Sequence, residues 1–375
     1  AEGVLMNAPL RIGFVVEGLD VGGTELSLMK WLRHCDRRRF EPFVFSFRSG
    51  PLEQELKNMG VAVGILAKEK AFDAAFVGLL ASEFKKARLH LVHCRNGIPA
   101  ICYGVVAGRL AGLPVISSIH GRTHYLERSL RTTVWFWILR LNHRVITVTE
   151  GIKKEIALLA HIPEKKMRVI HNGIDTANGE LFASRADLRR EVGLSENDFV
   201  IGTVGNLRPV KGQKYLVEAF AVVKKRLASA RLVLVGKGDE EANLRRQASE
   251  LGIADAVVFL GYQPDVASLI RTFDVFVLPS MSEGFPNVVL EAAMAKVPIV
   301  ASRVGGIEEI LVHERSGLLV EPKNADDIAG QIRRVATDQP LARRLTDAAY
   351  QTVAERFDVN RMLAQYDEEY EGLVN

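Results

Sequence analysis

The sequence predicts an α/β protein of two doubly wound domains, each a parallel sheet covered by helices on both faces. Short apolar runs rich in Val, Ile and Phe alternate with longer amphipathic stretches, which is typical of parallel strands joined by crossover helices. Two similar series of such runs are separated near residues 172–195. The 375 residues also exceed what one hydrophobic core usually organises. We therefore expect two α/β domains that face one another.

The expected strands follow the apolar runs of each half. In the first half they are residues 11–16, 40–47, 61–66, 89–94, 114–120, 144–149 and 167–172. In the second half they are residues 199–205, 231–236, 256–261, 275–279, 298–302 and 317–320. The segment HNGIDTANGELF between the halves carries a turn signal and changes composition, so we expect it to connect the domains. Domains are thus expected at 9–175 and 176–357, with a last helix at 358–375. The helical spacing of Met362, Leu363, Tyr366 and Tyr370 predicts that this helix packs on a domain surface.

Charge is unevenly distributed between the two halves. Residues 1–175 carry 25 Lys and Arg against 16 Asp and Glu, and the remainder carries 24 against 29. The basic half could attract an anionic partner such as a phospholipid surface or a lipid diphosphate, or it could simply be a solvated surface. We expect no nucleic-acid partner, because the basic residues are dispersed.

Cysteine usage and hydropathy indicate the compartment. Cys35, Cys94 and Cys102 lack metal or disulfide spacing, and no apolar run is long enough to cross a bilayer. We expect a cytoplasmic protein, and a peripheral position at the inner face of the membrane remains open.

The strongest site signal is the segment EGFPNVVLE, in which a Gly- and Pro-containing loop follows a buried strand and leads into a short helix. Its carboxylates, Glu283 and Glu291, can accept hydrogen bonds from adjacent hydroxyls, which suits a sugar or a ribose. Backbone N–H groups at the helix start favour a phosphate. These donors belong to Gly284, Phe285, Asn287 and Val288. The alternative is a capped helix whose acidic residues are incidental.

A second signal is the loop NLRPVK after the expected strand 199–205. Gly205 and Asn206 begin this loop, and Arg208 and Lys211 follow just before a helix. The two cations could neutralise a diphosphate and stabilise the charge that grows on a leaving nucleotide. Because no Asp-x-Asp triplet occurs in the chain, we expect no metal cofactor. The alternative is a solvated surface loop.

Weaker signals lie at two strand ends of the first half. Gly22 and Gly23 open a loop between a strand and a helix and would let a phosphate or an acceptor approach the backbone. A tight turn uses the same residues, and the spacing matches neither the dinucleotide nor the P-loop motif. His120 ends another strand and could hydrogen-bond a sugar hydroxyl, although isolated histidines are often structural.

The segment 122–144 combines Trp135, Phe136 and Trp137 with five arginines. An interfacial membrane helix has this composition. A helix that packs on the sheet needs the same apolar residues, and we favour that alternative.

Taken together, the motifs resemble the retaining glycosyltransferases of family four, which have the GT-B fold of two facing Rossmann-like domains with a donor cleft between them. The resemblance covers nearly the whole chain and rests on GGTE, RVITVTEGIKKEI, VIHNGID, VGNLRPVKG, LVLVGKGDEE, VFLGYQPDV, EGFPNVVLE and RVGGIEEIL. It implies an N-terminal acceptor-binding domain, a C-terminal nucleotide-sugar-binding domain and a last helix that crosses back to the N-terminal domain.

The same resemblance implies roles for individual residues. Glu291 would hold the ribose hydroxyls, Glu283 a hydroxyl of the transferred sugar, and Lys211 the diphosphate. The loop of Leu260, Gly261 and Tyr262 would receive the nucleobase. Asn206 departs from the family, which often has Arg at that position, and Arg208 is our candidate for the missing charge.

The function implied is transfer of a sugar from a nucleotide diphosphate sugar, with a UDP-sugar favoured, to an acceptor hydroxyl with retention at the anomeric carbon. Acceptors would be glycans, glycolipids or lipid-linked glycans of cell-surface polysaccharide or lipopolysaccharide synthesis. The alternatives are a sugar-nucleotide epimerase or hydrolase of the same fold, and a non-catalytic subunit that binds the donor without turnover.

Overall fold

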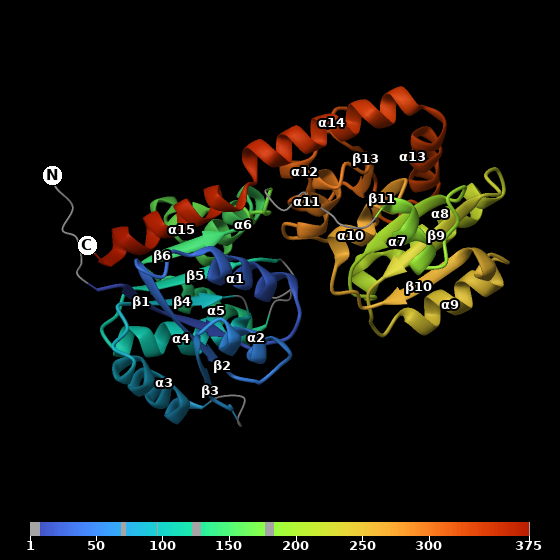
Figure 1. Ribbon diagram of the computed structural model, residues 1–375. Helices are drawn as coiled ribbons and strands as arrows, with labels where there is room; N and C mark the ends of the chain where they lie inside the picture. The colour runs from blue at the N-terminus through green and yellow to red at the C-terminus, as the bar shows by residue number, and fades with distance from the viewer. Residues whose placement is uncertain (1–7, 69–72, 96, 122–128, 177–183, 375) are drawn as a thin grey trace. The chain divides into compact units, whose positions relative to one another are not determined.

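The computed structural model describes residues 8–68, 73–95, 97–121, 129–176 and 184–374. The chain forms two compact units, each built around one parallel sheet (Figure 1). One unit comprises Ala1–Gly173 and Val359–Asn375, and the other comprises Ile174–Asp358. Every expected strand forms, so the predicted α/β class is confirmed.

The sheet of the first unit has the strand order β3-β2-β1-β4-β5-β6-β7. Its strands are β1 (Leu10–Val16), β2 (Phe40–Ser46), β3 (Ala62–Ile65), β4 (Leu91–Arg95), β5 (Val115–Ile119), β6 (Arg144–Thr147) and β7 (Met167–Val169). The helices between them are α1 (Gly23–His34), α2 (Leu52–Asn58), α3 (Ala74–Lys86), α4 (Ile98–Leu110), α5 (Leu130–Leu139) and α6 (Glu150–Ala160). The order reverses between β1 and β4, and ligands of such sheets bind outside the carboxyl ends of the strands at that point.

The sheet of the second unit has the order β10-β9-β8-β11-β12-β13. Its strands are β8 (Phe199–Val204), β9 (Ala230–Val235), β10 (Val257–Gly261), β11 (Val275–Leu278), β12 (Ile299–Ser302) and β13 (Leu318–Val320). Its helices are α7 (Arg185–Glu191), α8 (Gln213–Lys224), α9 (Glu241–Glu250), α10 (Val266–Ile270), α11 (Asn287–Met294), α12 (Ile307–Ile310), α13 (Ala325–Thr337) and α14 (Gln339–Arg356). Here the order reverses between β8 and β11, so the loops after these two strands border the expected ligand site.

The last helix, α15 (Val359–Val374), packs on the first unit (Figure 1). Its residues Met362, Leu363, Tyr366 and Tyr370 are buried in the same apolar core as Phe14 of β1. Tyr370 also reaches β4, where its hydroxyl lies 2.8 Å from Nδ1 of His93. The apolar stripe read from the sequence is therefore the face that this helix buries.

Arginines of the first unit pair with the acidic face of α15. The Arg144 guanidinium donates to Glu369 over 2.6 Å and that of Arg168 donates to the same carboxylate over 3.0 Å. Arg39 pairs with Asp367 at 2.9 Å. Some of the basic residues in excess within 1–175 therefore form ion pairs with α15 and are not available to an anionic partner.

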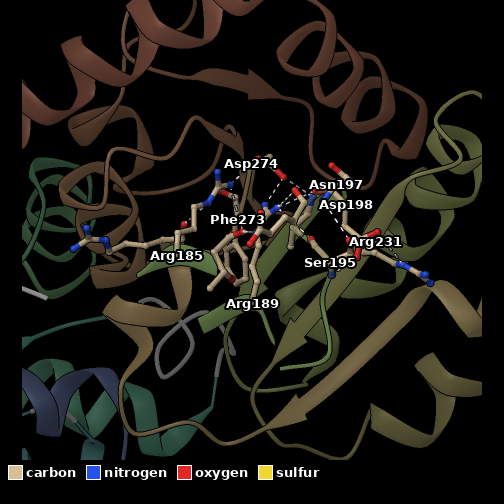
Figure 2. A network of polar contacts seen from close by, with 12 residues as sticks. Arg185, Arg189, Ser195, Asn197, Asp198, Arg231, Phe273 and Asp274 are labelled. Carbon is tan, nitrogen blue, oxygen red and sulfur yellow. Dashed lines mark hydrogen bonds and ion pairs between the residues drawn. The ribbon is translucent and has the colours of Figure 1, made fainter. Parts of the chain in front are cut away.

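An arginine–aspartate network fixes α7 to the amino ends of β8 and β11 (Figure 2). Asp274, just before β11, accepts from the backbone N–H of Val200 and from Nη2 of Arg189, each at 2.7 Å. The buried Arg189 also donates to the carbonyls of Thr272, Glu196 and Asp198. The network lies at the strand ends opposite the carboxyl edge, so we regard it as structural.

Among the described residues, no helix combines the length and apolar character that a bilayer crossing requires.

Candidate functional site

Lys211 and Glu283 meet at the carboxyl edge of the second sheet. Lys211 lies in the 3-10 turn Pro209–Lys211 that follows β8, and Glu283 lies in the loop between β11 and α11. Lys211 Nζ is 2.7 Å from Glu283 Oε1, and the Ser280 hydroxyl donates to the same oxygen over 2.6 Å. Glu283 is only 8% exposed. The two expected site residues therefore form a partly desolvated ion pair. Its hydrogen bond is charge-assisted and is stronger than one between neutral groups.

Two glycines fix the backbone around this pair. Gly212, directly after Lys211, has φ +66°, and an added Cβ would lie 2.2 Å from the carbonyl oxygen of Pro279. Gly305 has φ +55°, and its Cβ would lie 2.0 Å from the carbonyl oxygen of Glu283 itself. Only glycine adopts these conformations at low cost and leaves room for the neighbouring backbone. The loop that carries Glu283 is thus closely packed against the loops beside it.

Helix α11 begins at Asn287 with Pro286 as its N-cap and no side-chain cap. The first N–H groups of a helix have no acceptor within it, so those of Asn287 and Val288 are available to an anion. Phe285 is buried, with its ring 5.3 Å from that of Phe357, so only its backbone, like that of Gly284, can serve a ligand.

Glu291 lies one turn into α11, on the same face as Asn287. Among the described residues, the buried Oδ1 atom of Asn287 has no hydrogen-bond partner. Glu291 is half-buried. The structure therefore places the second expected carboxylate beyond the start of the helix, on the helix face that also carries Asn287.

The loop from Gly205 to Arg208 is held mainly through its backbone. The carbonyl of Asn206 accepts from Arg208 N at 2.9 Å and from Gln213 Nε2 at 3.1 Å. The Arg208 side chain is exposed, and within the described residues it has no ion-pair partner. The two expected cations thus differ, since Lys211 is paired with Glu283 and Arg208 is not.

The expected nucleobase loop lies at the end of β10. Leu260 is half-buried and its carbonyl accepts from Gln263 Nε2 over 2.8 Å. Tyr262, two residues further on, is 52% exposed. An exposed aromatic ring at this edge offers a face for stacking, and its role toward a base stays a prediction.

In the first unit, Gly22 is the N-cap of α1 and Gly23 is its first residue. A Cβ at Gly22 would lie 2.6 Å from a carboxylate oxygen of Glu25, whereas one at Gly23 would meet nothing within 4 Å. Gly22 itself has an extended backbone with φ −141°, and the carboxylate that its Cβ would meet ends a flexible side chain, so this position does not require glycine. Gly23 borders open space at the helix start, where backbone N–H groups favour anions.

His120 directly follows β5. Its Nε2 lies 3.2 Å from Nη2 of Arg95 and 3.0 Å from the Ser118 hydroxyl. Burial, and then the charge of Arg95, lower the pKa of His120 well below its usual range, so the imidazole is neutral at pH 7. The structure thus gives His120 two polar neighbours that the sequence did not indicate.

Three residues of these sites were absent from our sequence prediction, namely Ser280, Gly305 and Arg95. Ser280 could have been recognised from its place at the carboxyl end of an apolar strand. Gly305 lies in the segment RVGGIEEIL, where the paired glycines were the available signal. Arg95 is the charged end of the apolar run LVHC, and its burial gave no signal in the sequence. Within the described residues, no three His, Cys, Asp or Glu side chains cluster as a metal site requires.

Comparisons with known proteins identify the class. The profile of glycosyltransferase family 4 matches residues 21–178, and that of the glycosyl transferases group 1 matches residues 184–352. The structure resembles HepE from Anabaena, solved with UDP and glucose, with a TM-score of 0.87 and 24% identity over 97% of this chain and 100% of that one. The two doubly wound units therefore have the GT-B fold.

Two curated relatives agree with this class. An uncharacterised glycosyltransferase from Methanocaldococcus jannaschii is 36% identical over 219 residues, which are 57% of this chain and 56% of that protein. The UDP-Gal:alpha-D-GlcNAc-diphosphoundecaprenol alpha-1,3-galactosyltransferase of Escherichia coli is 28% identical over 267 residues, 68% of this chain and 69% of that protein. The chain is an enzyme that belongs to the family-4 glycosyltransferases.

Proposed function

We propose that this enzyme transfers a hexose from a UDP-sugar to an acceptor hydroxyl with retention at the anomeric carbon. The observation that carries the proposal is the Lys211–Glu283 pair, held by Ser280 at the carboxyl edge of the second sheet. It combines a cation for a diphosphate with a carboxylate for sugar hydroxyls. The HepE structures hold UDP with glucose or UDP-glucose, which supports UDP as the nucleotide.

Each part of the donor is assigned to a different loop or helix start of the second unit. Glu291 holds the ribose hydroxyls, and Leu260 and Tyr262 border the base. Backbone N–H groups at the start of α11 and Lys211 meet the diphosphate, while Glu283 contacts a hydroxyl of the sugar. For His120, contact with a sugar hydroxyl is proposed separately, on the polar neighbours that it has within its own unit.

In the proposed chemical step the bond between C1 of the sugar and the β-phosphate oxygen breaks, and a bond from the acceptor oxygen to C1 forms on the same face. The proton of the acceptor hydroxyl passes to the departing phosphate, so no enzyme carboxylate acts as a nucleophile. Lys211 stabilises the negative charge that grows on that phosphate. We propose that the reaction requires no metal, since a cation already lies where a diphosphate would be bound.

The donor assignment is tested by thermal unfolding with UDP-, GDP-, ADP- and CMP-sugars. We expect UDP-sugars to raise Tm most, because a ligand at 100 times its Kd stabilises the folded state by about 2.7 kcal/mol. Glu291→Ala should weaken donor binding by about 1–3 kcal/mol in calorimetry, the usual loss for hydrogen bonds to a charged group. A panel without any shift, or unchanged affinity in Glu291→Ala, would refute the donor site.

We also propose that an exposed stripe on α5 contacts an anionic membrane surface where a lipid-linked acceptor is met. Leu130 is 82% exposed, and Val134 and Trp137, at helical spacing from it, are 45% and 62% exposed. Trp135 and Leu139 on the other side are buried, so the helix both packs on its unit and presents an apolar face. Arg140 lies over the Trp137 ring at 4.1 Å and supplies positive charge beside the stripe. The E. coli relative's name, which includes a diphosphoundecaprenol acceptor, supports this acceptor class.

Vesicle sedimentation tests the membrane contact. We expect the enzyme to sediment with vesicles containing phosphatidylglycerol and much less with neutral phosphatidylcholine vesicles. The pair Leu130→Ser and Trp137→Ala should abolish sedimentation, because the stripe supplies the apolar contact. Leu251→Ser, which removes a leucine that is 43% exposed on the second unit, is the control. Equal binding by all variants would contradict the proposal.

A further inference from the structure

Arg95 is a buried arginine whose side chain is only partly satisfied by the described residues. It ends β4, is 1% exposed, and within the described residues forms no ion pair. Its Nε and Nη1 atoms have no hydrogen-bond partner there either. Burying a charge in this way costs several kcal/mol unless it is compensated. The nearby Glu25, whose pKa is raised by burial despite the attraction of Arg95, forms no ion pair with it. A residue kept at such a cost points to a task other than stability.

The contacts that Arg95 does make converge on His120. Nη2 of Arg95 donates to the Ser27 hydroxyl over 3.2 Å and lies 3.2 Å from Nε2 of His120. Ser27 in turn donates to Asn172 Oδ1 over 3.1 Å. On the other side, the guanidinium carbon of Arg95 is 5.8 Å from the centre of the Tyr366 ring. Side chains of α1 and α15 therefore hold the guanidinium beside the imidazole.

This geometry decides which ring nitrogen of His120 carries the proton. A guanidinium can only donate hydrogen bonds, so Nε2 of His120 must be the acceptor. The Ser118 hydroxyl, 3.0 Å from the same nitrogen, is then a second donor to it. In a neutral imidazole one nitrogen accepts and the other bears the proton. The proton consequently lies on Nδ1, a buried atom that has no hydrogen-bond partner among the described residues.

We propose that Arg95 is a positioning residue, which holds His120 as the Nδ1–H tautomer, so that the buried and unpartnered Nδ1–H is fixed as the hydrogen-bond donor that a substrate hydroxyl satisfies on binding. The identity of that substrate as the donor sugar rests on the proposed function, whereas the tautomer does not. A neutral donor suits a hydroxyl oxygen better than an anion and needs no proton transfer when the ligand binds. In the Nε2–H tautomer, Nδ1 would instead turn an acceptor lone pair toward the hydroxyl oxygen of the substrate.

The tautomer can be measured directly in the ligand-free enzyme by long-range ¹H–¹⁵N correlation of the imidazoles at pH 7.5, with His120→Gln to assign the signals. We expect the Nδ1–H pattern in the wild type. Arg95→Met should convert it to a mixture with Nε2–H, and Arg95→Lys, which still donates, should largely restore it. An Nε2–H pattern in the wild type overturns the proposal without any variant, so a folding defect in Arg95→Met cannot protect it.

Kinetics provide the second readout. We expect Arg95→Met to lower kcat by roughly 10- to 100-fold, by analogy with the loss of a hydrogen-bond partner that orients a metal-binding histidine, with little change in KM for the donor. Arg95→Met combined with His120→Gln should lose no more than His120→Gln alone, because both act through one contact. Additive losses overturn the positioning role. A lack of donor binding by the wild type would instead refute the proposed function and leave the tautomer result standing.

Discussion

Lys211→Ala is expected to lower kcat by roughly 100- to 1,000-fold, the range found when a group that stabilises developing negative charge is removed. Lys211 is the cation that the structure fixes at the carboxyl edge of β8, 2.7 Å from the buried carboxylate of Glu283. Charge on the leaving phosphate is largest in the transition state, so the loss should fall mainly on kcat rather than on KM. Initial rates over a range of donor concentrations measure the two parameters separately.

The lysine substitution also leaves Glu283 without its counter-charge, and this structural effect has to be separated from the catalytic one. Lys211→Ala together with Glu283→Gln removes both charges, so it should recover thermal stability lost by Lys211→Ala without recovering turnover. Lys214→Ala, which removes an exposed lysine three residues further along, is the matched charge control and should turn over normally. Recovery of turnover in the double variant would show that the lysine acts only by neutralising Glu283.

Cationic stabilisation of the leaving group also predicts the effect of Arg208→Ala and of metal removal. Because Arg208 is exposed, Arg208→Ala alone is expected to cost less than Lys211→Ala. Wild-type turnover should be unchanged in excess EDTA. If Lys211→Ala and Arg208→Ala together left turnover unchanged, cationic stabilisation of the leaving group would be wrong.

The fold was predictable because the strands of a parallel sheet are buried on both faces and appear in the sequence as continuous apolar runs. The errors lie at the strand ends. We expected a strand to Thr149, but β6 ends at Thr147, because the Thr149 side chain accepts from the N–H of Ile152 and caps α6. Such a capping residue resembles a strand residue in composition and differs only in its hydrogen bond.

The site was predictable as separate segments but not as contacts. Lys211 and Glu283 are far apart in sequence and meet because β8 and β11, which are not consecutive, pair in the sheet. Sequence patterns identify the strands and not their order, so the contact of Lys211 with Glu283 and the backbone contact of Gly305 with Glu283 could not be inferred. Arg95 escaped detection for a related reason, since its unusual property is burial without an ion pair among the described residues, which only packing reveals.

Asp274→Ala is expected to destabilise the second unit by about 3–5 kcal/mol, the usual cost of breaking a buried ion pair from one side. The change leaves the buried Arg189 guanidinium without its counter-charge and removes the acceptor of the Val200 N–H at the start of β8 (Figure 2). Hydrogen exchange followed by mass spectrometry measures the loss where it occurs. We expect the amides of β8 and β11 to lose protection by roughly two to four orders of magnitude, since 1.4 kcal/mol is tenfold.

Glu241→Ala is the matched control, because it removes a carboxylate of the same unit whose partner, Arg245, is largely exposed. An exposed pair four residues apart on a helix contributes only about 0.3–0.5 kcal/mol, so protection of β8 and β11 should barely change. The peptides of β1 and β4 in the first unit serve as an internal reference. An equally small effect of Asp274→Ala would mean that water or other carbonyls compensate Arg189, and that its pair with Asp274 is dispensable for the fold.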